Sequence, residues 1–383
     1  MVDFPEKLRK KLLKRETEGA LRSLAGNDNK VDFSSNDYLG FARNEALFAK
    51  TFQLLLKEGI SQNGSTGSRL LSGNHRLYGR LEKDLAQFHK AESALVFNSG
   101  YDANIGFFST VPKREDVVFY DELVHASIRD GIKLGNAKSY KFDHNSIDDL
   151  ISCVERNRSI KETSGEVYIV TESVFSMDGD SPDLSALVNL CANNNYHLIV
   201  DEAHATGVMG NKGAGLVQHL NLHGEVFARI ATFGKALGSH GAAILGSVEL
   251  IDYLVNFSRS FIYTTGLTPH TLATIVSAYQ FLDSAEEEQQ RLLENISYFK
   301  QKLKTLELDP FFVPSDSPIQ SCVIPGNEKV RCVSRKLGDE GFDIKAILAP
   351  TVPEGQERLR FCLHSFNTEG EITWVLQLLK KYL

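Results

Sequence analysis

Asp201 and His204 stand three residues apart in LIVDEAHATG, and Lys235 follows about thirty residues later in TFGKALG. Each comes at or just after a short apolar run, as does Gly100 in the stretch FNSGYDAN. A carboxylate, an imidazole and an amine can serve as a charge partner, a proton carrier and a nucleophile. These side chains predict an enzyme active site, and the surrounding sequence discriminates between two classes of enzyme.

The tetrapeptide DEAH, residues 201–204, is also the magnesium-binding signature of one class of helicase. An ATPase of that class needs a GxxxxGK[ST] loop around the phosphates, N-terminal to its acidic motif. The only Gly-Lys pair is Gly234-Lys235, which follows DEAH, is continued by Ala236 and has no glycine five residues before it. The formal net charge of −7 provides no basic footprint for a polyanion, so we expect no nucleic acid partner. A DEAH-type ATPase remains the remote alternative.

The same residues match the needs of pyridoxal phosphate. A lysine binds the aldehyde of this cofactor, an aspartate pairs with its pyridinium nitrogen, and the amides of a helix N-terminus hold its phosphate. Taken singly, an aspartate at a strand end is usually a helix cap, and a loop lysine is usually solvated. Taken together, Asp201, Lys235 and Gly100 predict a pyridoxal phosphate site.

The elements that must position these residues follow from the hydrophobic pattern. From about residue 90, helical stretches alternate with the short apolar runs ALVF, DVVFYD, EVYIVTE, HLIVDEA, RIATFG and ILGS. This alternation predicts an α/β fold, a mostly parallel sheet with helices on both faces. Ligands of such sheets bind at the carboxyl ends of the strands, where Asp201 and Lys235 are expected.

The chain is predicted to divide into three parts. Residues 1–40 form an N-terminal helix and arm, 41–280 a large cofactor-binding domain, and 281–383 a smaller α+β domain. The small domain is expected to begin with a long charged helix and to contain strands near residues 322–326, 342–348 and 358–366. The N-terminal helix is amphipathic and is expected to pack on the body through its leucines, namely Leu8, Leu12, Leu13 and Leu21.

Several classes of protein are disfavoured by composition. The five cysteines are scattered without a CxxC pair, which argues against a disulfide framework and a zinc site, and we predict no metal. The N-terminus lacks the apolar core of a signal peptide, and nowhere are there eighteen uninterrupted apolar residues. We therefore expect a cytoplasmic protein with no membrane span.

A series of motifs covers nearly the whole chain: FSSNDYLG (33–40), GSTGSRLLSGNHRLYGRLE (64–82), FNSGYDAN (97–104), YDELVHASIRDG (120–131), TESVFSMDGD (171–180), VDEAHATG (200–207), TFGKALG (232–238), FIYTTGLTP (261–269) and PTVPEGQERLRFCL (350–363). In this order they resemble the α-oxoamine synthases. These are fold-type I pyridoxal phosphate enzymes, transferases with a large and a small domain, which condense a small amino acid with an acyl thioester and release carbon dioxide.

Among the branches of this family, FSSNDYLG and the ending RLRFCLHSFNTEGEI most resemble the one that joins L-alanine to a pimeloyl thioester in biotin biosynthesis. The thioester is carried by coenzyme A or by an acyl carrier protein. The serine- and palmitoyl-using branch and the glycine-using ligase branch share the cofactor motifs, so both alternatives stay open. A cofactor-free partner subunit of the same fold is disfavoured because Lys235, Asp201, His204 and His125 are all present.

The resemblance implies a role for each matching residue. Lys235 would bind the cofactor and act as base and acid at the substrate Cα, and Asp201 would hold the pyridinium proton. His204 would bind the phenolic oxygen, and His125 would stack on the ring. Further cofactor contacts are implied for Gly100, Tyr101, Ser176 and Thr232, and from the neighbouring subunit for Thr264 and Thr265. The resemblance thus implies a homodimer with shared active sites.

Substrate contacts are expected near the C-terminus. RLRFCLH alternates as a strand, with Arg358, Arg360 and Cys362 on one face and Leu359, Phe361 and Leu363 on the other. A guanidinium fork suits an α-carboxylate, and the resemblance favours Arg360 for that role. It also implies substrate contacts for His125, Asn36, Thr351 and Arg22.

Overall fold

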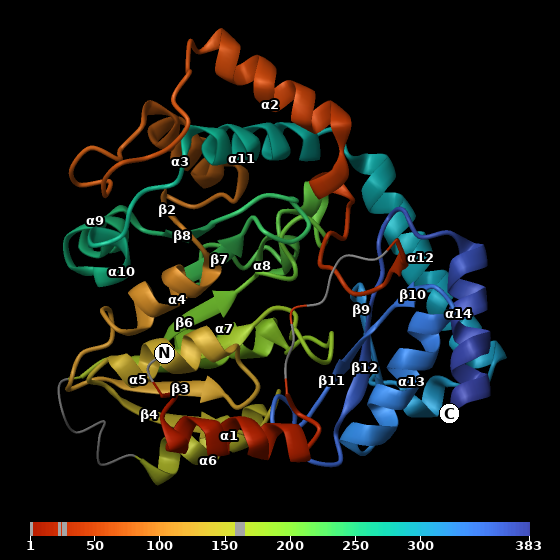
Figure 1. Cartoon of the computed structure of the whole chain (residues 1–383). Helices are drawn as coiled ribbons and strands as arrows, with labels where there is room; N and C mark the ends of the chain where they lie inside the picture. The colour runs from red at the N-terminus through yellow and green to blue at the C-terminus, as the bar shows by residue number, and fades with distance from the viewer. Residues whose placement is uncertain (1–2, 22–23, 25–28, 158–164) are drawn as a thin grey trace. The chain divides into compact units, whose positions relative to one another are not determined.

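The computed structural model describes residues 3–21, 24, 29–157 and 165–383 (Figure 1). The chain forms two compact units. The larger comprises Asn36–Ser176 and Ser181–Gln290, and the smaller comprises Met1–Ser35, Met177–Asp180 and Arg291–Leu383. The expected division into domains at 1–40, 41–280 and 281–383 stays a prediction. The smaller compact unit contains both the N-terminal residues, up to Ser35, and the C-terminal residues from Arg291.

The larger unit contains a seven-stranded sheet in the order β2-β8-β7-β6-β5-β3-β4 (Figure 1). Strand β8 runs antiparallel to both of its neighbours, and the other neighbouring strands are parallel. The mostly parallel sheet predicted from the apolar runs is therefore confirmed. The strands are β2 (Ser93–Phe97), β3 (Val117–Asp121), β4 (Lys138–Phe142), β5 (Val167–Glu172), β6 (His197–Asp201), β7 (Ala228–Thr232) and β8 (Ala242–Gly246).

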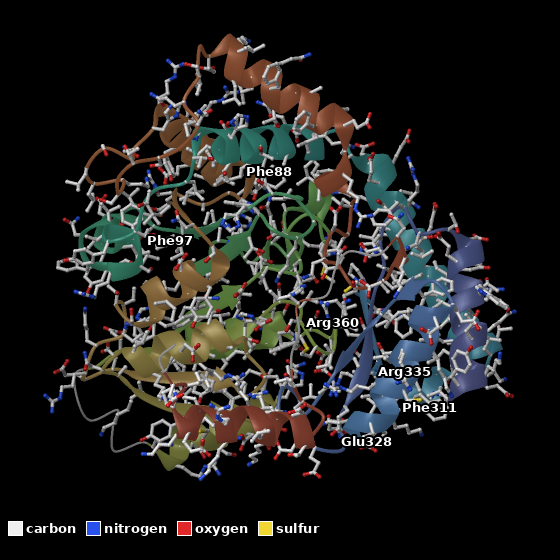
Figure 2. All side chains as sticks on the ribbon, viewed as in Figure 1. Phe88, Phe97, Phe311, Glu328, Arg335 and Arg360 are labelled. Carbon is white, nitrogen blue, oxygen red and sulfur yellow. The ribbon has the colours of Figure 1, made fainter. Side chains whose placement is uncertain are left out.

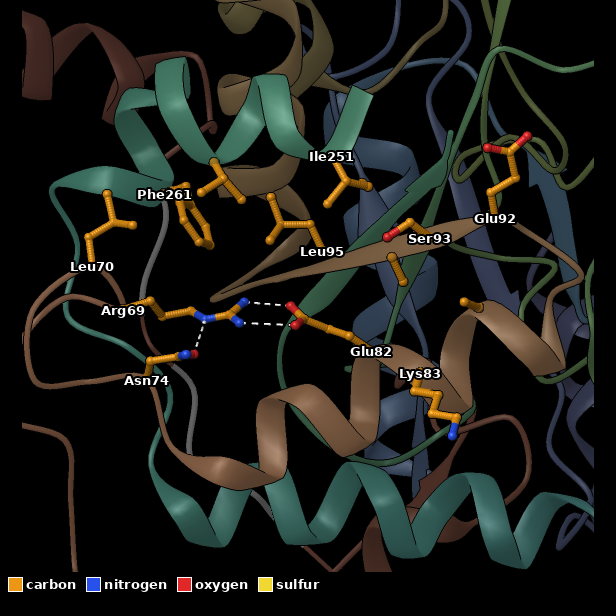
Figure 3. A pocket seen from close by; sticks show the side chains of 13 residues that line it. Arg69, Leu70, Asn74, Glu82, Lys83, Glu92, Ser93, Leu95, Ile251 and Phe261 are labelled. Carbon is orange, nitrogen blue, oxygen red and sulfur yellow. Dashed lines mark hydrogen bonds and ion pairs between the residues drawn. The ribbon is translucent and has the colours of Figure 1, made fainter. Parts of the chain in front are cut away.

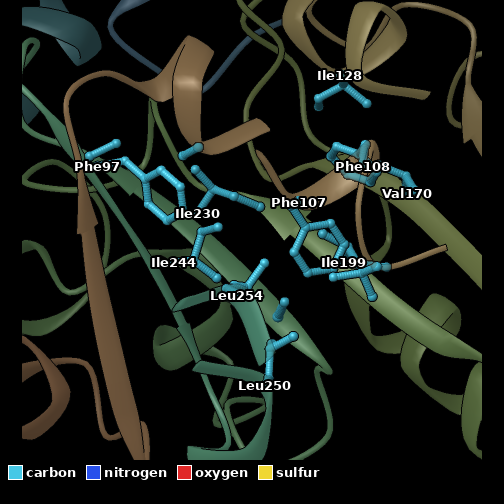
Figure 4. Close-up of a cluster of buried hydrophobic side chains, with 14 of the residues drawn as sticks. Phe97, Phe107, Phe108, Ile128, Val170, Ile199, Ile230, Ile244, Leu250 and Leu254 are labelled. Atoms are coloured by element: carbon cyan, nitrogen blue, oxygen red, sulfur yellow. The ribbon is translucent and has the colours of Figure 1, made fainter. Parts of the chain in front are cut away.

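Both faces of this sheet are buried, because alternate residues of a strand point to opposite sides. On β6, Leu198 and Val200 pack in one core with α6 and α7. Ile199 points to the other core, with Phe107 of α4 and Leu254 of α9 (Figure 4). This is why the central strands are continuous apolar runs that end abruptly in polar residues.

Helices of the larger unit begin at capping residues. The side chain of Ser99 accepts a hydrogen bond from the amide of Asp102 at the start of α4, and Thr268 caps α11 with Pro269 in its first turn. Helix α11 packs beside α2 and α3 (Figure 1). The helices are α2 (Glu45–Lys57), α3 (Arg76–Phe88), α4 (Gly100–Phe108), α5 (Ala126–Leu134), α6 (Ile147–Arg156), α7 (Leu184–Asn194), α8 (Leu216–His219), α9 (Val248–Phe257), α10 (Arg259–Ile262) and α11 (Pro269–Leu282), with 3-10 turns η1 (Phe41–Arg43) and η3 (Asn211–Gly213).

The smaller unit is α+β, as predicted. An antiparallel sheet has the order β11-β12-β9, and a short parallel pair joins β1 to β10. A capping box between Thr368 and Glu371 starts the last helix. The elements are α1 (Glu6–Thr17), β1 (Val31–Asp32), α12 (Glu286–Thr305, in this unit from Arg291), η4 (Asp309–Phe311), β9 (Ile319–Val323), α13 (Asn327–Asp339), β10 (Phe342–Asp343), β11 (Lys345–Ile347), β12 (Arg358–Cys362) and α14 (Glu369–Tyr382).

The N-terminal helix forms where it was expected, but the prediction that its leucines pack on the body of the protein is wrong in the single chain. No residue of α1 is buried, and Leu8, Leu12 and Leu13 are 45%, 50% and 51% exposed. The leucine spacing identifies an apolar face without identifying what covers it. Across the described part of the chain, no helix has the length and apolar character needed to cross a bilayer.

Candidate active site

A pocket of about 260 Å³ opens in the larger unit. Its walls come from the carboxyl ends of β5, β6 and β7 and from the N-terminal ends of α4 and α5, which is where a doubly wound sheet binds its ligands. Eight of the predicted site residues line it: Asn36, Gly100, Tyr101, His125, Asp201, His204, Thr232 and Lys235.

Asp201 is the last residue of β6 and is only 5% exposed. Its Oδ2 accepts a hydrogen bond from Nδ2 of Asn104 at 2.9 Å, and its Oδ1 accepts one from the amide of Ala203 at 3.0 Å. These donors hold the carboxylate in one orientation at the pocket wall. A buried carboxylate of this kind suits a cationic ring nitrogen.

Lys235 lies in the tight turn that joins β7 to β8. The carbonyl of Lys235 accepts a hydrogen bond from the amide of Gly238 at 2.8 Å. Gly238 has a φ of +57°, and a Cβ there would lie 2.2 Å from the amide nitrogen of Ala42. Only glycine therefore allows this turn to pack so closely, and the turn places the Lys235 side chain among the pocket residues.

The N-terminus of α4 forms a cradle for an anion. Backbone amides in the first turn of a helix have no partner within the helix, and the helix dipole favours negative charge there. A Cβ at Gly100 would lie 2.8 Å from Cγ2 of Thr232, so a side chain would fill the cradle. Thr232 donates its hydroxyl proton to the carbonyl of Ala203 at 3.3 Å. This cradle fits a phosphate group.

Tyr101 lines the same pocket, but its hydroxyl points to α5. It donates a hydrogen bond to Asp130 at 2.7 Å, and the side chain is 48% exposed. A backbone contact from α4 is compatible with this geometry, whereas a ring contact by the Tyr101 side chain stays a prediction.

His125 caps α5 and is tied to Asp201 by a short chain of polar side chains. Its Nδ1 lies 2.7 Å from Oγ of Ser127, which accepts a hydrogen bond from Nδ2 of Asn104 at 3.0 Å. Asn104 also donates to Asp201. Burial lowers the pKa of His125; the charge of Asp201 has a smaller effect that raises it, and the charge of Lys235 a smaller effect that lowers it further. A flat imidazole ring in this position suits stacking on the ring of a cofactor.

Sequence reasoning missed Glu172, which lines the pocket at the end of β5 and is 3% exposed. Its Oε1 accepts a hydrogen bond from the main-chain amide of His125 at 2.5 Å. Burial, together with nearby Asp201, raises the pKa of Glu172 to about 8. The available signal was its position at the end of a buried strand, as for Asp201. Asn104 also escaped notice, although a polar residue in the apolar run ANIGFF is a sign of a buried hydrogen bond.

Thr264 and Thr265 lie in the larger unit but are not among the residues that line this pocket. Nδ2 of Asn98 donates to Oγ1 of Thr264 at 3.1 Å and to the carbonyl of Thr265 at 2.7 Å. The next amide, of Gly266, donates to the carbonyl of Gly67 at 3.0 Å. The expectation that both threonines serve a neighbouring subunit stays a prediction.

Arg69 lines a second cavity and anchors the loop that carries Gly67 (Figure 3). Arg69 forms two hydrogen bonds with the carboxylate of Glu82, at 2.5 and 3.0 Å, and its guanidinium lies 3.8 Å above the ring of Tyr78. The Tyr78 hydroxyl accepts a hydrogen bond from the amide of Leu267 at 2.6 Å. Arg69 therefore helps to position the segment that contains the two threonines.

The remaining predicted site residues are placed as follows. Arg360 is in β12 of the smaller unit (Figure 2), where its Nη1 donates to Sγ of Cys362 at 3.0 Å. Arg358 forms an ion pair with Asp178 in the same unit, so it is already engaged. Thr351 also belongs to the smaller unit, and Ser176 belongs to the larger unit without lining the pocket. Arg22 lies outside the described residues.

The fold and the pocket define a fold-type I pyridoxal phosphate-dependent transferase. An amine, a buried carboxylate at a strand end, a histidine and an anion cradle at a helix N-terminus all line one pocket, and together they fit this cofactor. The model of the family "Aminotransferase class I and II" matches residues 28–378. The chain belongs to this family and, within it, to the α-oxoamine synthases.

Three relatives illustrate the range of similarity. The 8-amino-7-oxononanoate synthase of Emericella nidulans is 39% identical, with 99% of this chain and 95% of the relative covered. A crystal structure of 8-amino-7-oxononanoate synthase from Francisella tularensis is 29% identical with a TM-score of 0.77, covering 93% and 98%. Serine palmitoyltransferase from S. paucimobilis, solved with bound pyridoxal phosphate and myriocin, is 26% identical with a TM-score of 0.88, covering 98% and 96%.

Proposed function

We propose that this chain condenses L-alanine with a pimeloyl thioester, giving 8-amino-7-oxononanoate, carbon dioxide and a free thiol in biotin biosynthesis. The observation that carries the proposal is the gathering of Lys235, Asp201, His204 and His125 in one pocket of a chain 39% identical to an 8-amino-7-oxononanoate synthase. The higher TM-score of serine palmitoyltransferase supports that enzyme as the second candidate. We give more weight to sequence identity, because the fold is common to enzymes with different substrates.

The chain's own residues divide the work of holding the cofactor. The amine of Lys235 would bond to the aldehyde carbon of pyridoxal phosphate, Asp201 would accept a hydrogen bond from the protonated ring nitrogen, and His204 would donate to the phenolic oxygen. Gly100 and Thr232 would hold the phosphate at the start of α4. When bound, the cofactor draws the electron pair of a broken Cα bond into its ring.

Proton transfer at the substrate falls to Lys235. With alanine bound, the free amine of Lys235 would remove the Cα proton and later return a proton to the same carbon. Between these transfers, the electron pair left on Cα would form a bond to the thioester carbonyl carbon as the C–S bond breaks. The released thiolate would take a proton from solvent, and the carboxylate would be lost from Cα as carbon dioxide. His125 would cover the reacting centre on one face.

Four residues are proposed to recognise the substrate. Asn36 lines the pocket, whereas Arg360, Thr351 and Arg22 are proposed from the family resemblance, with Arg360 binding the α-carboxylate of alanine. We further propose a cytoplasmic homodimer in which Thr264 and Thr265 reach the partner's cofactor phosphate. The thioester would be carried by coenzyme A or by an acyl carrier protein.

A substrate matrix tests this proposal. The purified chain with pyridoxal phosphate is given alanine, serine or glycine, each with pimeloyl, palmitoyl or acetyl thioester, and thiol release and product mass are measured. We expect alanine with the pimeloyl thioester to be fastest. Fastest release with serine and palmitoyl thioester would instead support serine palmitoyltransferase, and fastest release with glycine and acetyl thioester would support the ligase.

Cofactor attachment is tested separately. Sodium borohydride should fix the cofactor to Lys235 irreversibly, and mass spectrometry of the digested protein should locate the adduct. An adduct on another lysine, or none at all, would remove Lys235 from its proposed role.

A further inference from the structure

Tyr38 links two residues of the pocket without lining it. Its hydroxyl lies 2.7 Å from Nδ1 of His204 and 3.1 Å from Oδ1 of Asn36. Both of these neighbours line the pocket, and all three residues belong to the larger unit. Tyr38 is 0% exposed and His204 is 4% exposed, so the contact is shielded from solvent.

The position of the Tyr38 ring is set by a tight turn of the backbone. The amide of Tyr38 donates to the carbonyl of Asn36, and the amide of Gly40 donates to the carbonyl of Asp37, each at 2.9 Å. Oδ1 of Asp37 accepts a hydrogen bond from the amide of Ala42 at 3.1 Å. Gly40 has a φ of 75°, a left-handed conformation that favours glycine. The ring is therefore held in place by the chain itself.

His204 is held by the turn that follows β6. The amides of Ala205 and Thr206 both donate to the carbonyl of Glu202, at 3.0 and 2.9 Å. The side chain of Glu202 in turn accepts a hydrogen bond from the amide of Val217 at 2.9 Å. Two rigid turns thus bring the phenol and the imidazole together.

A tyrosine hydroxyl has one proton, so at any moment it donates to Nδ1 of His204 or to Oδ1 of Asn36, but not to both. The nitrogen is the nearer atom, and a neutral imidazole nitrogen is a stronger base than an amide oxygen. When Tyr38 donates to Nδ1, that nitrogen has no proton of its own. The neutral ring then carries its proton on Nε2.

We propose that Tyr38 is a positioning residue that holds His204 in the tautomer with its proton on Nε2, so that His204 acts as a hydrogen-bond donor. The inference rests on the proposed function, in which His204 donates to the phenolic oxygen of pyridoxal phosphate. Without the Tyr38 hydroxyl, the ring can also protonate on Nδ1. It would then turn a lone pair of Nε2 toward a partly negative oxygen and weaken cofactor binding.

The Tyr38→Phe variant tests the proposal, because it removes the hydroxyl and keeps the buried ring. Tyr279→Phe is a matched control: Tyr279 is also buried, and its hydroxyl lies 2.9 Å from Nε2 of His89 without either residue lining the pocket. Both variants and the wild type are prepared as full-length chains labelled with ¹⁵N in histidine. Nuclear magnetic resonance of the ring nitrogens then reports which nitrogen of each histidine carries a proton, with and without pyridoxal phosphate.

The His204 signal is assigned by its loss in His204→Gln. We expect Nε2 protonation in the wild type and in Tyr279→Phe, and appearance of the Nδ1-protonated form in Tyr38→Phe. Affinity for pyridoxal phosphate should fall by about tenfold in Tyr38→Phe and by less than about twofold in Tyr279→Phe. Wild-type His204 protonated on Nδ1 would overturn the proposal even if Tyr38→Phe fails to fold. An unchanged His204 signal in a folded Tyr38→Phe would also overturn it.

Failure of the proposed function would look different. The histidine measurement is made on the chain without cofactor as well as with it, so it does not depend on the substrates turned over. A chain that shows the expected tautomer but prefers serine and palmitoyl thioester would keep the role of Tyr38 and change only the reaction.

Discussion

Asp201 is the residue on which the proposed chemistry most depends. Its two oxygens accept hydrogen bonds from Asn104 and Ala203. An asparagine has nearly the same shape, but its NH2 group would face one of these donors, so a moderate loss of cofactor affinity is expected. Asp201→Asn is expected to keep the fold and to bind pyridoxal phosphate within about tenfold of wild type. Turnover should fall by about 100-fold or more, because a neutral amide no longer stabilises a protonated ring nitrogen. Parallel cofactor titration and steady-state kinetics measure the two effects, and near-native turnover would refute the charge argument.

Glu172 is expected to make the stability of the cofactor-free chain depend on pH. Its pKa is raised from an ordinary 4.5 to about 8, chiefly by burial. The folded chain therefore holds this proton more tightly than the unfolded chain does. The contribution is fully present below about 4.5 and is lost as the pH rises through about 8, so the free energy of unfolding falls across that window.

Glu172→Gln replaces the carboxyl group with a group that does not titrate. The fall in unfolding free energy between pH 5 and pH 8.5 should become smaller by ~1–3 kcal/mol, as measured by urea denaturation. Glu249→Gln, at an exposed position in the first turn of α9, serves as the control and should leave the profile unchanged. An identical pH profile for Glu172→Gln and wild type would contradict the raised pKa.

At the scale of elements, the close packing at the start of α4 predicts that a side chain added at Gly100 weakens phosphate binding. A Cβ on Gly100 would lie 2.8 Å from Thr232, whereas a Cβ on Gly79 in α3 has no atom within 4 Å. Gly100→Ala should weaken pyridoxal phosphate binding by about tenfold or more, because the added methyl displaces Thr232 from the cradle. Gly79→Ala should leave binding unchanged and stabilise α3 by about 0.5–1 kcal/mol. Equal binding by both variants would argue against phosphate at this helix.

Element prediction from the sequence worked best where burial dominates. The six apolar runs became strands β2, β3, β5, β6, β7 and β8, because a strand covered on both faces must be apolar throughout. Strand β4, Lys138–Phe142, was not predicted. It lies at the edge of the sheet with Lys138, Ser139 and Lys141 exposed, so KSYKF carries no apolar run.

The site was predictable in part for the same reason. Asp201 is the last residue of a strand, Lys235 follows one closely, and Gly100 begins a helix, so the pattern of strand ends located these three. Thr232 also ends a strand, but it was expected only from the family resemblance. Glu172 also ends a strand, but one carboxylate among many strand-end polar residues gives no distinctive signal. Tyr38 could not be found from its own segment, because its partner His204 is 166 residues away in the sequence.

At the scale of the whole molecule, a single chain exposes several apolar side chains of its helices to solvent. On α2, Phe48, Phe52 and Leu56 recur every four residues and are 76%, 53% and 64% exposed, while Leu47 and Leu55 on the adjacent face are buried. Contiguous apolar ridges of this kind are uncommon on monomers and often mark protein interfaces. The ridge supports the proposed homodimer, as does the exposed face of α1.

The sharing of active sites between subunits can be tested with mixed dimers. One copy carries Lys235→Ala, and the other carries Thr264→Val and Thr265→Val, each with a different purification tag; dimers retaining both tags are isolated after co-expression. If the threonines serve the partner's site, one site of the mixed dimer contains Lys235→Ala together with both valine substitutions. The other site then contains the wild-type lysine and both wild-type threonines. About half of the wild-type activity should then return, although each parent dimer is nearly inactive.

If each site were built from a single chain, both sites would carry a defect and the mixed dimer would stay as inactive as its parents. A dimer of two differently tagged Lys235→Ala copies, which has no intact site under either arrangement, gives the background for that comparison.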